Sequence, residues 1–393
     1  MSSDTRRGLR WFAVLAVIAL FATTTHATAQ EEVSVGDGAG VGRDGPPIPE
    51  VGIEKMPAAR TSRPGGHMGH LPPEVPFTDE SLDTYNALLG TAAVDQVIHS
   101  ITFDADGEIT EVVYDATEPS AEALVREAVG PDIAIFASDV VPRSTQSGVR
   151  DRDNDTYGHF NGASIRDSMV GGAQAACTSG VTLTNGTHKT ASTAGHCVLD
   201  QVNQDGQYWW WSPGWIEYHG NTPATAVSFV DTVWIISGNE TYDEAVYHGG
   251  TTTGSYDPVT DAWDYAPFGT YVCVSGAKSG SVCSYRKKAV RYINEGHWEF
   301  FVDVFEHDGS RKCQAELIKG DSGGAVYRRV YLGGGIYTAE VYGNYVANQP
   351  WITNDCLPGV QRWEIEVARN DEINLIYPWA YVSDGSGGPA SSW

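Results

Sequence analysis

All six cysteines of this 393-residue chain lie after residue 170, and this one-sided distribution divides the sequence into two parts. From about residue 150 onward, Gly, Thr, Tyr and Trp become common, and short apolar runs alternate with turn-forming residues. Long helical periodicity is scarce there, so the pattern favours an all-β barrel or sandwich. The cysteine-free part before it is expected to fold separately.

The first 29 residues have the pattern of a secretory signal peptide. Arginines at positions 6, 7 and 10 precede an apolar stretch from Trp11 to about Ala22, and small residues follow up to Ala29. The apolar stretch is short for a membrane span, so a retained anchor is the less favoured alternative. Residues 1–29 are therefore predicted to be removed, leaving a secreted, extracellular chain with no membrane association.

Export makes disulfides the expected state of an even number of cysteines. The spacing alone fixes no pairing among Cys177, Cys197, Cys273, Cys283, Cys313 and Cys356. No C-x-x-C pair is present, which disfavours a zinc site. His67 and His70 lie in a Pro/Gly-rich stretch with no third ligand in view, so no metal is predicted there.

Residues 30–150 form a predicted linker and a small folded unit. The linker is rich in Gly, Pro and charge. Beyond it, Val97–Phe103 and Ile109–Tyr114 read as strands joined by a turn, and Ser120–Val129 has helical spacing. A small α+β unit is therefore expected before the cysteine-containing domain, which takes residues 151–393.

Within residues 151–393, several runs predict individual elements. Val227–Val230, Thr232–Ile236 and Tyr331–Tyr337 are apolar runs between turns and are interpreted as strands. Gln361–Arg369 has the spacing of a C-terminal helix.

The net charge of −25 excludes one class of function. A protein that binds nucleic acid needs a cationic surface, and 25 Lys and Arg against 50 Asp and Glu do not supply one.

Two short motifs carry a recognisable chemistry, Thr193-Ala-Gly-His-Cys197 and Gly320-Asp-Ser-Gly-Gly324. A serine hydroxyl is a weak nucleophile and needs a base, and imidazole suits this role because its pKa lies near neutrality. Glycines beside the serine let backbone N–H groups point toward a developing oxyanion, here those of Gly320 and Ser322.

Together, the two motifs resemble those of the chymotrypsin/trypsin-like serine peptidases, most closely the secreted actinobacterial streptogrisin-like branch. The resemblance spans about residues 155 to 385. It implies two antiparallel six-stranded β-barrels with a C-terminal helix, and a preceding propeptide that assists folding and inhibits the enzyme. It makes His196 the general base and Ser322 the nucleophile, and it pairs Asp321 with an internal cation or a chain N-terminus.

The resemblance also implies three disulfides, Cys177–Cys197, Cys273–Cys283 and Cys313–Cys356. The branch has glycine after the second cysteine of its small disulfide loop, whereas this chain has Ser284.

The third catalytic residue must be a carboxylate between His196 and Ser322 in the order implied by the resemblance. Asp231 lies between apolar residues and is favoured as the buried partner of the imidazole. Asp243 is the alternative, in a more polar stretch. The remaining aspartates between them and the nucleophile read as loop residues: Asp257, Asp261 and Asp264.

Substrate-binding residues are less well marked. The stretch Gly335–Ala339 resembles the strand that pairs with substrate backbone, which would place Thr338 and Ala339 at the pocket wall. Glu316 is a candidate pocket acid or a surface residue. Tyr208–Trp211, with Trp215, forms an exposed binding surface or part of the core.

The sequence therefore predicts a monomeric, secreted serine endopeptidase that acts on polypeptides and needs no metal or organic cofactor. The alternative is a non-catalytic binding or adhesion module that uses the Trp-rich surface of a peptidase-like fold. A Ser-Asp-His esterase is disfavoured because His196 precedes Ser322 in this chain.

Overall fold

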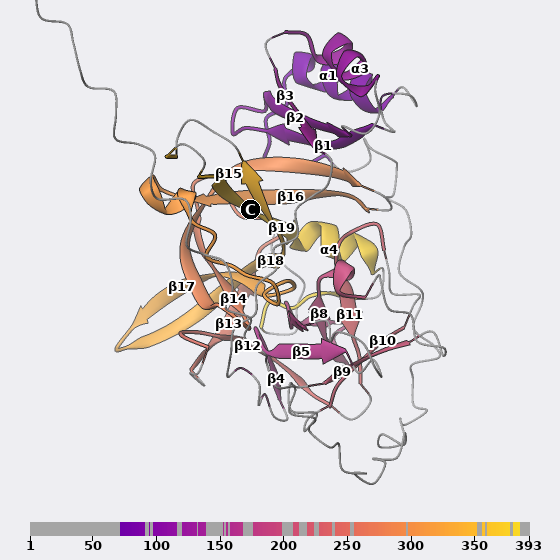
Figure 1. The fold of residues 1–393 in the computed structure, drawn as a ribbon. Coiled ribbons are helices and arrows are strands. Elements are labelled where there is room, and N and C mark those ends of the chain that lie inside the picture. The colour runs from indigo at the N-terminus through magenta and orange to yellow at the C-terminus, as the bar shows by residue number, and fades with distance from the viewer. Residues whose placement is uncertain are drawn as a thin grey trace, which may run out of the picture. The chain divides into compact units, whose positions relative to one another are not determined.

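The computed structural model describes most of the chain between residues 71 and 385 (Figure 1). The description omits residues 91–93, 95–96, 116–119, 132, 139–151, 153–154, 156–157, 168–175, 199–206, 212–217, 224–227, 238–239, 252–254, 296–297, 352–355, 358–359 and 378–379. The predicted signal peptide and most of the predicted linker lie outside the described residues. No helix among those described is long and apolar enough to cross a membrane.

The front region, defined as residues 71–138, contains two helices and three strands. They are α1 (Asp79–Leu89), β1 (Ile98–Phe103), β2 (Ile109–Asp115), α3 (Ala121–Val129) and β3 (Ala134–Ser138). Thr78 and Ser81 form a capping box at the start of α1, a helix that the sequence analysis missed. The predicted strand pair and the second helix are confirmed, although the side chain of Ser120 makes no capping hydrogen bond.

The remaining strands form a mostly β structure. Its first half contains β4 (His159–Asn161), β5 (Ser164–Asp167), β6 (Ala176–Thr178), β7 (Leu183–Thr184), β8 (Lys189–Thr193), β9 (Gln207–Trp211), β10 (Tyr218–Pro223), β11 (Val233–Ile235) and β12 (Tyr242–Tyr247). Its second half contains β13 (Tyr256–Ala262), β14 (Tyr271–Gly276), β15 (Gly280–Glu295), β16 (Trp298–His307), β17 (Ala325–Gly333), β18 (Ile336–Trp351), β19 (Arg362–Arg369), α4 (Asn370–Ile376) and β20 (Tyr381–Val382). Short 3-10 turns occupy Gly195–Cys197 and Gly309–Cys313.

The described strands form three sheets, and no closed barrel is evident among them. A twelve-stranded sheet runs β3-β2-β1-β15-β14-β17-β18-β13-β12-β4, with β16 and β19 joined to it. Two four-stranded sheets run β10-β9-β5-β6 and β11-β8-β7-β20. Most pairs are antiparallel, but β2 with β3, β4 with β12, and β13 with β18 are parallel.

Three predictions of individual elements are wrong. Gln361–Arg369 was expected to be a helix, but β19 covers Arg362–Arg369 and the helix α4 follows it. Tyr331–Tyr337 is not one strand, because β17 ends at Gly333 and β18 begins at Ile336, with three consecutive glycines of positive φ at the hairpin tip. Residues 228–230 are not a strand, since a bend covers residues 229–231, whereas β11 falls within the predicted strand Thr232–Ile236.

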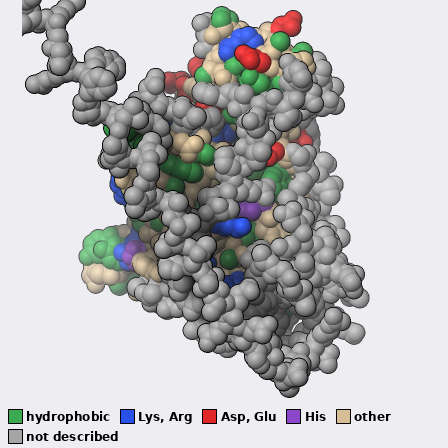
Figure 2. All heavy atoms as spheres, viewed as in Figure 1, with side chains coloured by type: hydrophobic (Ala, Val, Ile, Leu, Met, Phe, Trp, Pro, Cys, Tyr) green, Lys and Arg blue, Asp and Glu red, His purple; other side chains and the backbone are tan. Residues whose placement is uncertain are grey.

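The β17–β18 hairpin leaves apolar side chains in solvent at its tip (Figure 2). Tyr331, Leu332 and Ile336 are each more than half exposed. The turn residues Gly333, Gly334 and Gly335 have φ of 100°, 61° and 84°, which glycine adopts without steric cost.

The front region shares a sheet and a core with the cysteine-containing domain. Strand β1 pairs antiparallel with β15, with Ile101 opposite Tyr292. Val290, Tyr292 and Phe301 are buried in the same apolar cluster as residues of α1, β1, β2 and α3. Two further clusters lie in the rest of the domain, and the larger of them contains the disulfide Cys177–Cys197.

Candidate active site

His196 and Asp231 come together because the strands next to them pair. Strand β8 leads into the turn that holds His196, and β11 begins two residues after Asp231. In the antiparallel pair of β8 and β11, Thr193 is opposite Val233. The register, extended by two residues, sets Gly195 against Asp231, and a Cβ on Gly195 would lie 3.0 Å from Asp231 Oδ1.

Two hydrogen bonds orient the His196 imidazole on the Asp231 carboxylate. The backbone N–H of His196 donates to Oδ1 at 2.7 Å, and Nδ1 of its ring lies 2.7 Å from Oδ2. Asp231 is buried, whereas the side chain of His196 is 15% exposed. With Nδ1–H held by the carboxylate, Nε2 is the ring nitrogen that can accept a proton from a nucleophile.

The Gly-Asp-Ser-Gly-Gly turn packs directly against the motif that carries His196. Gly323 has φ of 90°, and a Cβ there would lie 2.3 Å from Thr193 Oγ1 and 2.8 Å from the backbone nitrogen of Ala194. The carbonyl of Ser322 accepts a hydrogen bond of 2.8 Å from the backbone N–H of Thr178. Glycine is therefore required at position 323, and the close packing fixes Ser322 beside the His196 turn.

Two backbone N–H groups in the turn around Ser322 have no hydrogen-bond acceptor among the described residues. The N–H groups of Asp321, Gly323 and Gly324 donate to backbone carbonyls. Those of Gly320 and Ser322 have no hydrogen-bond acceptor within the described part of the chain. Gly320 has φ of 105°, a backbone conformation that residues with a side chain rarely adopt. They are the two donors that the sequence motif predicts for an oxyanion hole.

The side chain of Asp321 holds this turn in place through hydrogen bonds. Its buried carboxylate accepts hydrogen bonds from the backbone N–H groups of Lys278 (2.7 Å), Ser279 (3.0 Å) and Ile318 (2.8 Å), and from the Ser279 hydroxyl (2.6 Å). Burial raises the pKa of Asp321, and these donors oppose the rise. The hydrogen-bond donors are amides and a hydroxyl, and the internal cation that the resemblance implies is represented by the buried Arg152, which interacts electrostatically with Asp321 without a hydrogen bond to it.

The Ser322 hydroxyl makes no hydrogen bond to the His196 ring in the described residues. Catalytic hydrogen bonds are often long without substrate and shorten in the reactive complex. His196 and Asp231 are therefore in direct hydrogen-bond contact. Ser322 is held near them because its turn packs against the turn that carries His196.

The three disulfides have the pairing that the resemblance implies. They are Cys177–Cys197, Cys273–Cys283 and Cys313–Cys356, and the described residues contain no free cysteine. The first ties β6 to the residue after His196, so it braces the turn that carries the imidazole. The residue after Cys283 is Ser284, which has φ of 77° in the position where the branch has glycine.

Thr338 and Ala339 lie away from the Ser322 turn. They pair with Val330 and Arg329 on β17, whereas Asn344 pairs with Ala325 immediately after the turn. Ala339 and Asn344 are five residues apart on β18, or about 17 Å along an extended strand. The residue of β18 that contacts the turn is Tyr345, which accepts from Gly323 N–H and donates to the Gly324 carbonyl.

The other candidate carboxylates do not reach His196. Asp243 is exposed, and Asp257 lies on β13 in an ion pair with Arg329 at 2.7 Å. Glu316 was a candidate pocket acid, but it forms hydrogen bonds with Arg311 and with His307. The prediction that Asp257 and Asp261 lie in loops is wrong, because both belong to β13.

Trp210 in the Trp-rich segment belongs to the core. It is fully buried, and its Nε1–H donates to Thr222 Oγ1 at 2.9 Å. The side chains of its neighbours in β9 and of Trp215 lie outside the described residues.

Comparisons with known proteins place the chain near one group of structures. No protein-family model and no curated protein matches it. It is similar to a glutamic acid-specific serine protease described as using a histidine triad in substrate binding, with 18% identity over 57% of this chain and 100% of that one, and a TM-score of 0.39.

Two further structures are similar over the same share of this chain. Protease A of Thermobifida fusca has 18% identity, 97% of its chain covered and a TM-score of 0.36. Chymotrypsin of Cellulomonas bogoriensis has 18% identity, 98% of its chain covered and a TM-score of 0.37. These neighbours are chymotrypsin-like serine proteases of low sequence identity.

Proposed function

We propose that this protein is a secreted serine endopeptidase with His196, Asp231 and Ser322 as its catalytic triad. The observation that carries the proposal is the pair of 2.7 Å contacts from His196 to the buried Asp231, packed against the Ser322 turn. In that turn the N–H groups of Gly320 and Ser322 have no acceptor among the described residues. An oriented imidazole beside a serine on a glycine-rich turn is the arrangement that acyl transfer requires.

Each group has one task in the proposed reaction. Ser322 Oγ attacks the scissile carbonyl while His196 Nε2 takes its proton, and Asp231 stabilises the imidazolium. The N–H groups of Gly320 and Ser322 donate to the oxyanion. His196 then gives the proton to the leaving amine, which breaks the peptide bond and leaves an acyl-enzyme. Water, activated by His196, hydrolyses the acyl-enzyme.

Substrate backbone is proposed to bind along β18 beyond Tyr345 rather than at Thr338 and Ala339. In that part of β18, residues 347–351 pair with β19 on one side, while the pairing with β17 ends at Asn344. Within the described residues the second edge is therefore free next to the Ser322 turn. An extended peptide can add to such an edge through backbone hydrogen bonds.

The two-barrel arrangement is part of the same proposal. His196 and Asp231 come from the half that contains β8 and β11, and Ser322 comes from the half that contains β14 and β17. A cleft between two such halves would give a polypeptide access to both.

The front region is proposed to act as a propeptide that assists folding and inhibits the enzyme. Its β1 pairs with β15, and the hairpin of β15 and β16 carries Trp298, whose ring lies 6.4 Å from that of His196. Docking of β1 therefore supports a hairpin that reaches the general base. A template of this kind lowers the cost of forming non-local strand pairs.

The ion pairs at this contact favour a removable region. Front-region Glu74 contacts Lys287 and Arg369, and Glu111 contacts Arg291. Each cation also has an acidic partner within residues 151–393, namely Asp303, Asp371 and Glu364 respectively. Release of the front region thus leaves none of the three without a counter-charge.

The apolar part of the same contact favours the alternative of a permanent accessory domain. Removal of the front region would expose Val290, Tyr292 and Phe301, which are buried by it. Three arginines near the boundary at residue 150 are candidate processing points, and of these Arg143 and Arg150 lie outside the described residues. Arg152 is buried and donates to Ser275 Oγ and Gly162 O, which disfavours it as a cleavage site.

Export to an oxidising compartment is supported by three disulfides, which are rare in reducing compartments. A monomer that binds polypeptides and no nucleic acid is expected. The binding-module alternative loses part of its basis, since Trp210 is buried.

Mass spectrometry of the secreted protein after incubation with a peptide library tests the proposed function. Internal cleavage of peptides is expected, with none by the Ser322→Ala variant, and the same spectra give the N-terminus of the mature chain. Equal cleavage by the wild type and Ser322→Ala would contradict the proposal. A mature chain that still begins before residue 138 would favour the accessory domain.

A further inference from the structure

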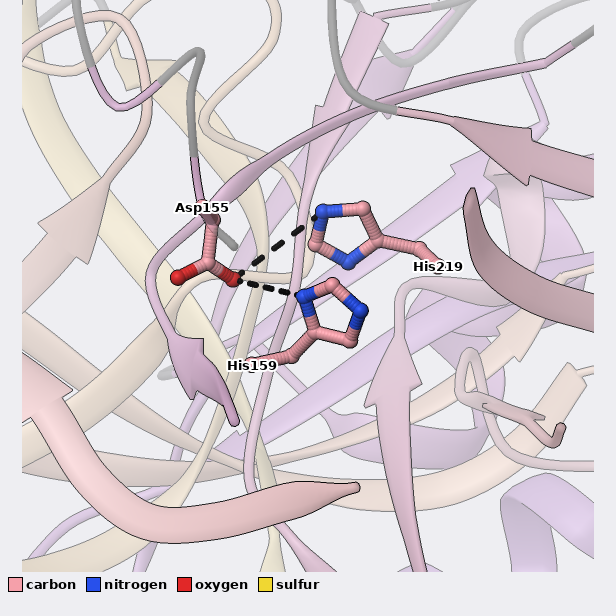
Figure 3. Close-up of side chains that lie close together, drawn as sticks. All are labelled: Asp155, His159 and His219. Atoms are coloured by element: carbon pink, nitrogen blue, oxygen red, sulfur yellow. Dashed lines mark hydrogen bonds and ion pairs between the residues drawn. The ribbon is translucent and has the colours of Figure 1, made fainter. Parts of the chain in front are cut away.

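Three buried side chains from two separate segments of the chain converge at a second cluster. Figure 3 shows Asp155, His159 and His219 turned toward one another, with both rings on one side of the carboxylate. Asp155 precedes β4, His159 begins β4, and His219 lies in β10. All three are at most 2% exposed. They are not part of the proposed catalytic site.

The separations of their ligand atoms suit one metal ion. His159 Nδ1 lies 3.2 Å and His219 Nε2 lies 3.9 Å from Asp155 Oδ2, and the three candidate ligand atoms are within 4.8 Å of one another. Bonds of about 2.1 Å in a tetrahedral arrangement put ligand atoms about 3.4 Å apart. The first distance is within a few tenths of an ångström of this value, and the second exceeds it by about half an ångström.

His219 is the observation that calls for a ligand. It is fully buried, yet neither Nδ1 nor Nε2 has a hydrogen-bond partner among the described residues. A buried imidazole without hydrogen bonds is costly, because its ring nitrogens have lost their hydrogen bonds to water without replacing them. The register shift between Tyr218 and Gly220, where β10 bulges against β9, re-aims the side chain between them.

The other two side chains are already held by neighbours of the kind that orient metal ligands. His159 Nε2 lies 3.2 Å from the Tyr218 carbonyl and 3.4 Å from Glu240 Oε2. The Tyr247 hydroxyl donates to Asp155 Oδ1 at 2.6 Å. A metal-binding histidine commonly donates its second ring N–H to a carbonyl or carboxylate, which leaves Nδ1 of His159 to face the metal.

We propose that Asp155, His159 and His219 bind one zinc ion, with water as the fourth ligand. Two imidazoles and a carboxylate are ligands that zinc prefers. The two rings are stacked, with centroids 3.8 Å apart and planes inclined by 25°, so the His219 ring turns to point Nε2 at the ion. Within the described part of the chain, His219 has no hydrogen bond that would oppose this rotation.

The site would fasten the beginning of the proposed enzyme domain. The segment that carries Asp155 and His159 follows the candidate processing points, and β10 belongs to a different sheet from β4. One ion would thus join β4, the segment before it and β10, and it would stabilise this junction whether or not the chain is a peptidase.

Zinc retention by the full chain tests the site. The Ser322→Ala chain is stripped with EDTA, loaded with zinc, passed through a desalting column and assayed for metal. We expect His219→Gln to retain one zinc fewer per chain than its parent, with binding weakened by more than the roughly 10- to 100-fold that loss of a residue orienting a metal ligand costs. His188→Gln, which changes an exposed turn histidine, is the matched control and should behave as the parent does.

Cobalt absorption of the unmutated site provides a readout that needs no ligand variant to fold. Cobalt(II) added to the stripped Ser322→Ala chain should give the intense visible bands of a tetrahedral site, and zinc should remove them. Zinc should also raise the thermal midpoint of this chain. Equal zinc retention by His219→Gln and His188→Gln, or no tetrahedral cobalt spectrum, would overturn the proposal.

Discussion

The position of the His196 imidazole depends on a single carboxylate, and the sequence context of that carboxylate is what made it predictable. Asp231 lies between apolar residues and is buried in the structure, whereas Asp243 is exposed. The motifs around His196 and Ser322 were predictable because the chemistry limits which residues can serve. Thr338 and Ala339 were not, because their place depends on the length of a hairpin that no local pattern reveals.

Replacing Asp231 with Asn should lower kcat roughly 10,000-fold, because an amide cannot hold the Nδ1–H tautomer or stabilise the imidazolium. Steady-state hydrolysis of a peptide substrate measures this. The exposed Asp243→Asn is the matched control and should keep wild-type activity. A large loss in the control with little loss in Asp231→Asn would reverse the assignment.

Replacing Ser284 with Gly should stabilise the protein by about 1 kcal/mol, because Ser284 has φ of 77°, where a Cβ is strained. A higher thermal midpoint in the Ser322→Ala background is the expected result. Ser255 is also exposed but has no positive φ, so Ser255→Gly should lower the midpoint instead. Equal shifts for the two variants would show that backbone strain at Ser284 is not the cause.

The helices and strands that form through local interactions were predictable from the local sequence pattern. The strands β1 and β2 with their turn, and the helix α3, follow the alternation and spacing in the sequence. The helix predicted at β19 is wrong although a strand signal is present, because apolar residues alternate there with Glu364 and Glu366. In the structure both are buried against Arg291 of β15, a partner some 70 residues away that the local sequence does not indicate.

The contact between β2 and β15 should depend on pH through Glu111. Burial raises its pKa to about 7 from an ordinary 4.5, although Arg291 opposes the rise. The folded form therefore holds a proton that the unfolded chain gives up, so stability from this group increases as the pH falls from about 7 to 4.5. The thermal midpoint of the Ser322→Ala chain, followed across this range, should rise on acidification.

Glu111→Gln separates this effect from the titration of histidines in the same range. The variant should show a smaller rise in midpoint on acidification than its parent, because the amide has no proton to gain. An unchanged pH dependence in Glu111→Gln would contradict the assignment to Glu111.

At the scale of the whole molecule, the front region completes a sheet of twelve strands. The composition shift near residue 150 predicted two parts, and the resemblance implied that the first assists the second. The sequence does not reveal that β1 pairs with β15 or that Val290, Tyr292 and Phe301 form the shared core. Such pairings depend on surfaces that exist only after both parts have folded.

Deleting residues 30–138 should slow refolding about tenfold or more, because β15 and β16 would have to form without the template of β1. Recovery of native fluorescence after dilution from denaturant, in the Ser322→Ala background, measures the rate. Adding the front region as a separate chain should restore part of it. Equal refolding rates with and without residues 30–138 would rule out a folding role.

The rate at which a fluorophosphonate attaches to Ser322, followed by mass spectrometry of the mature protein, tests the proposed triad most directly. The account predicts one adduct per chain on Ser322, no adduct in Ser322→Ala, and strongly slowed attachment in His196→Ala and Asp231→Asn. Asp243→Asn should react at the wild-type rate. Absence of the adduct from the mature wild-type protein, or attachment that does not depend on His196, would contradict the account.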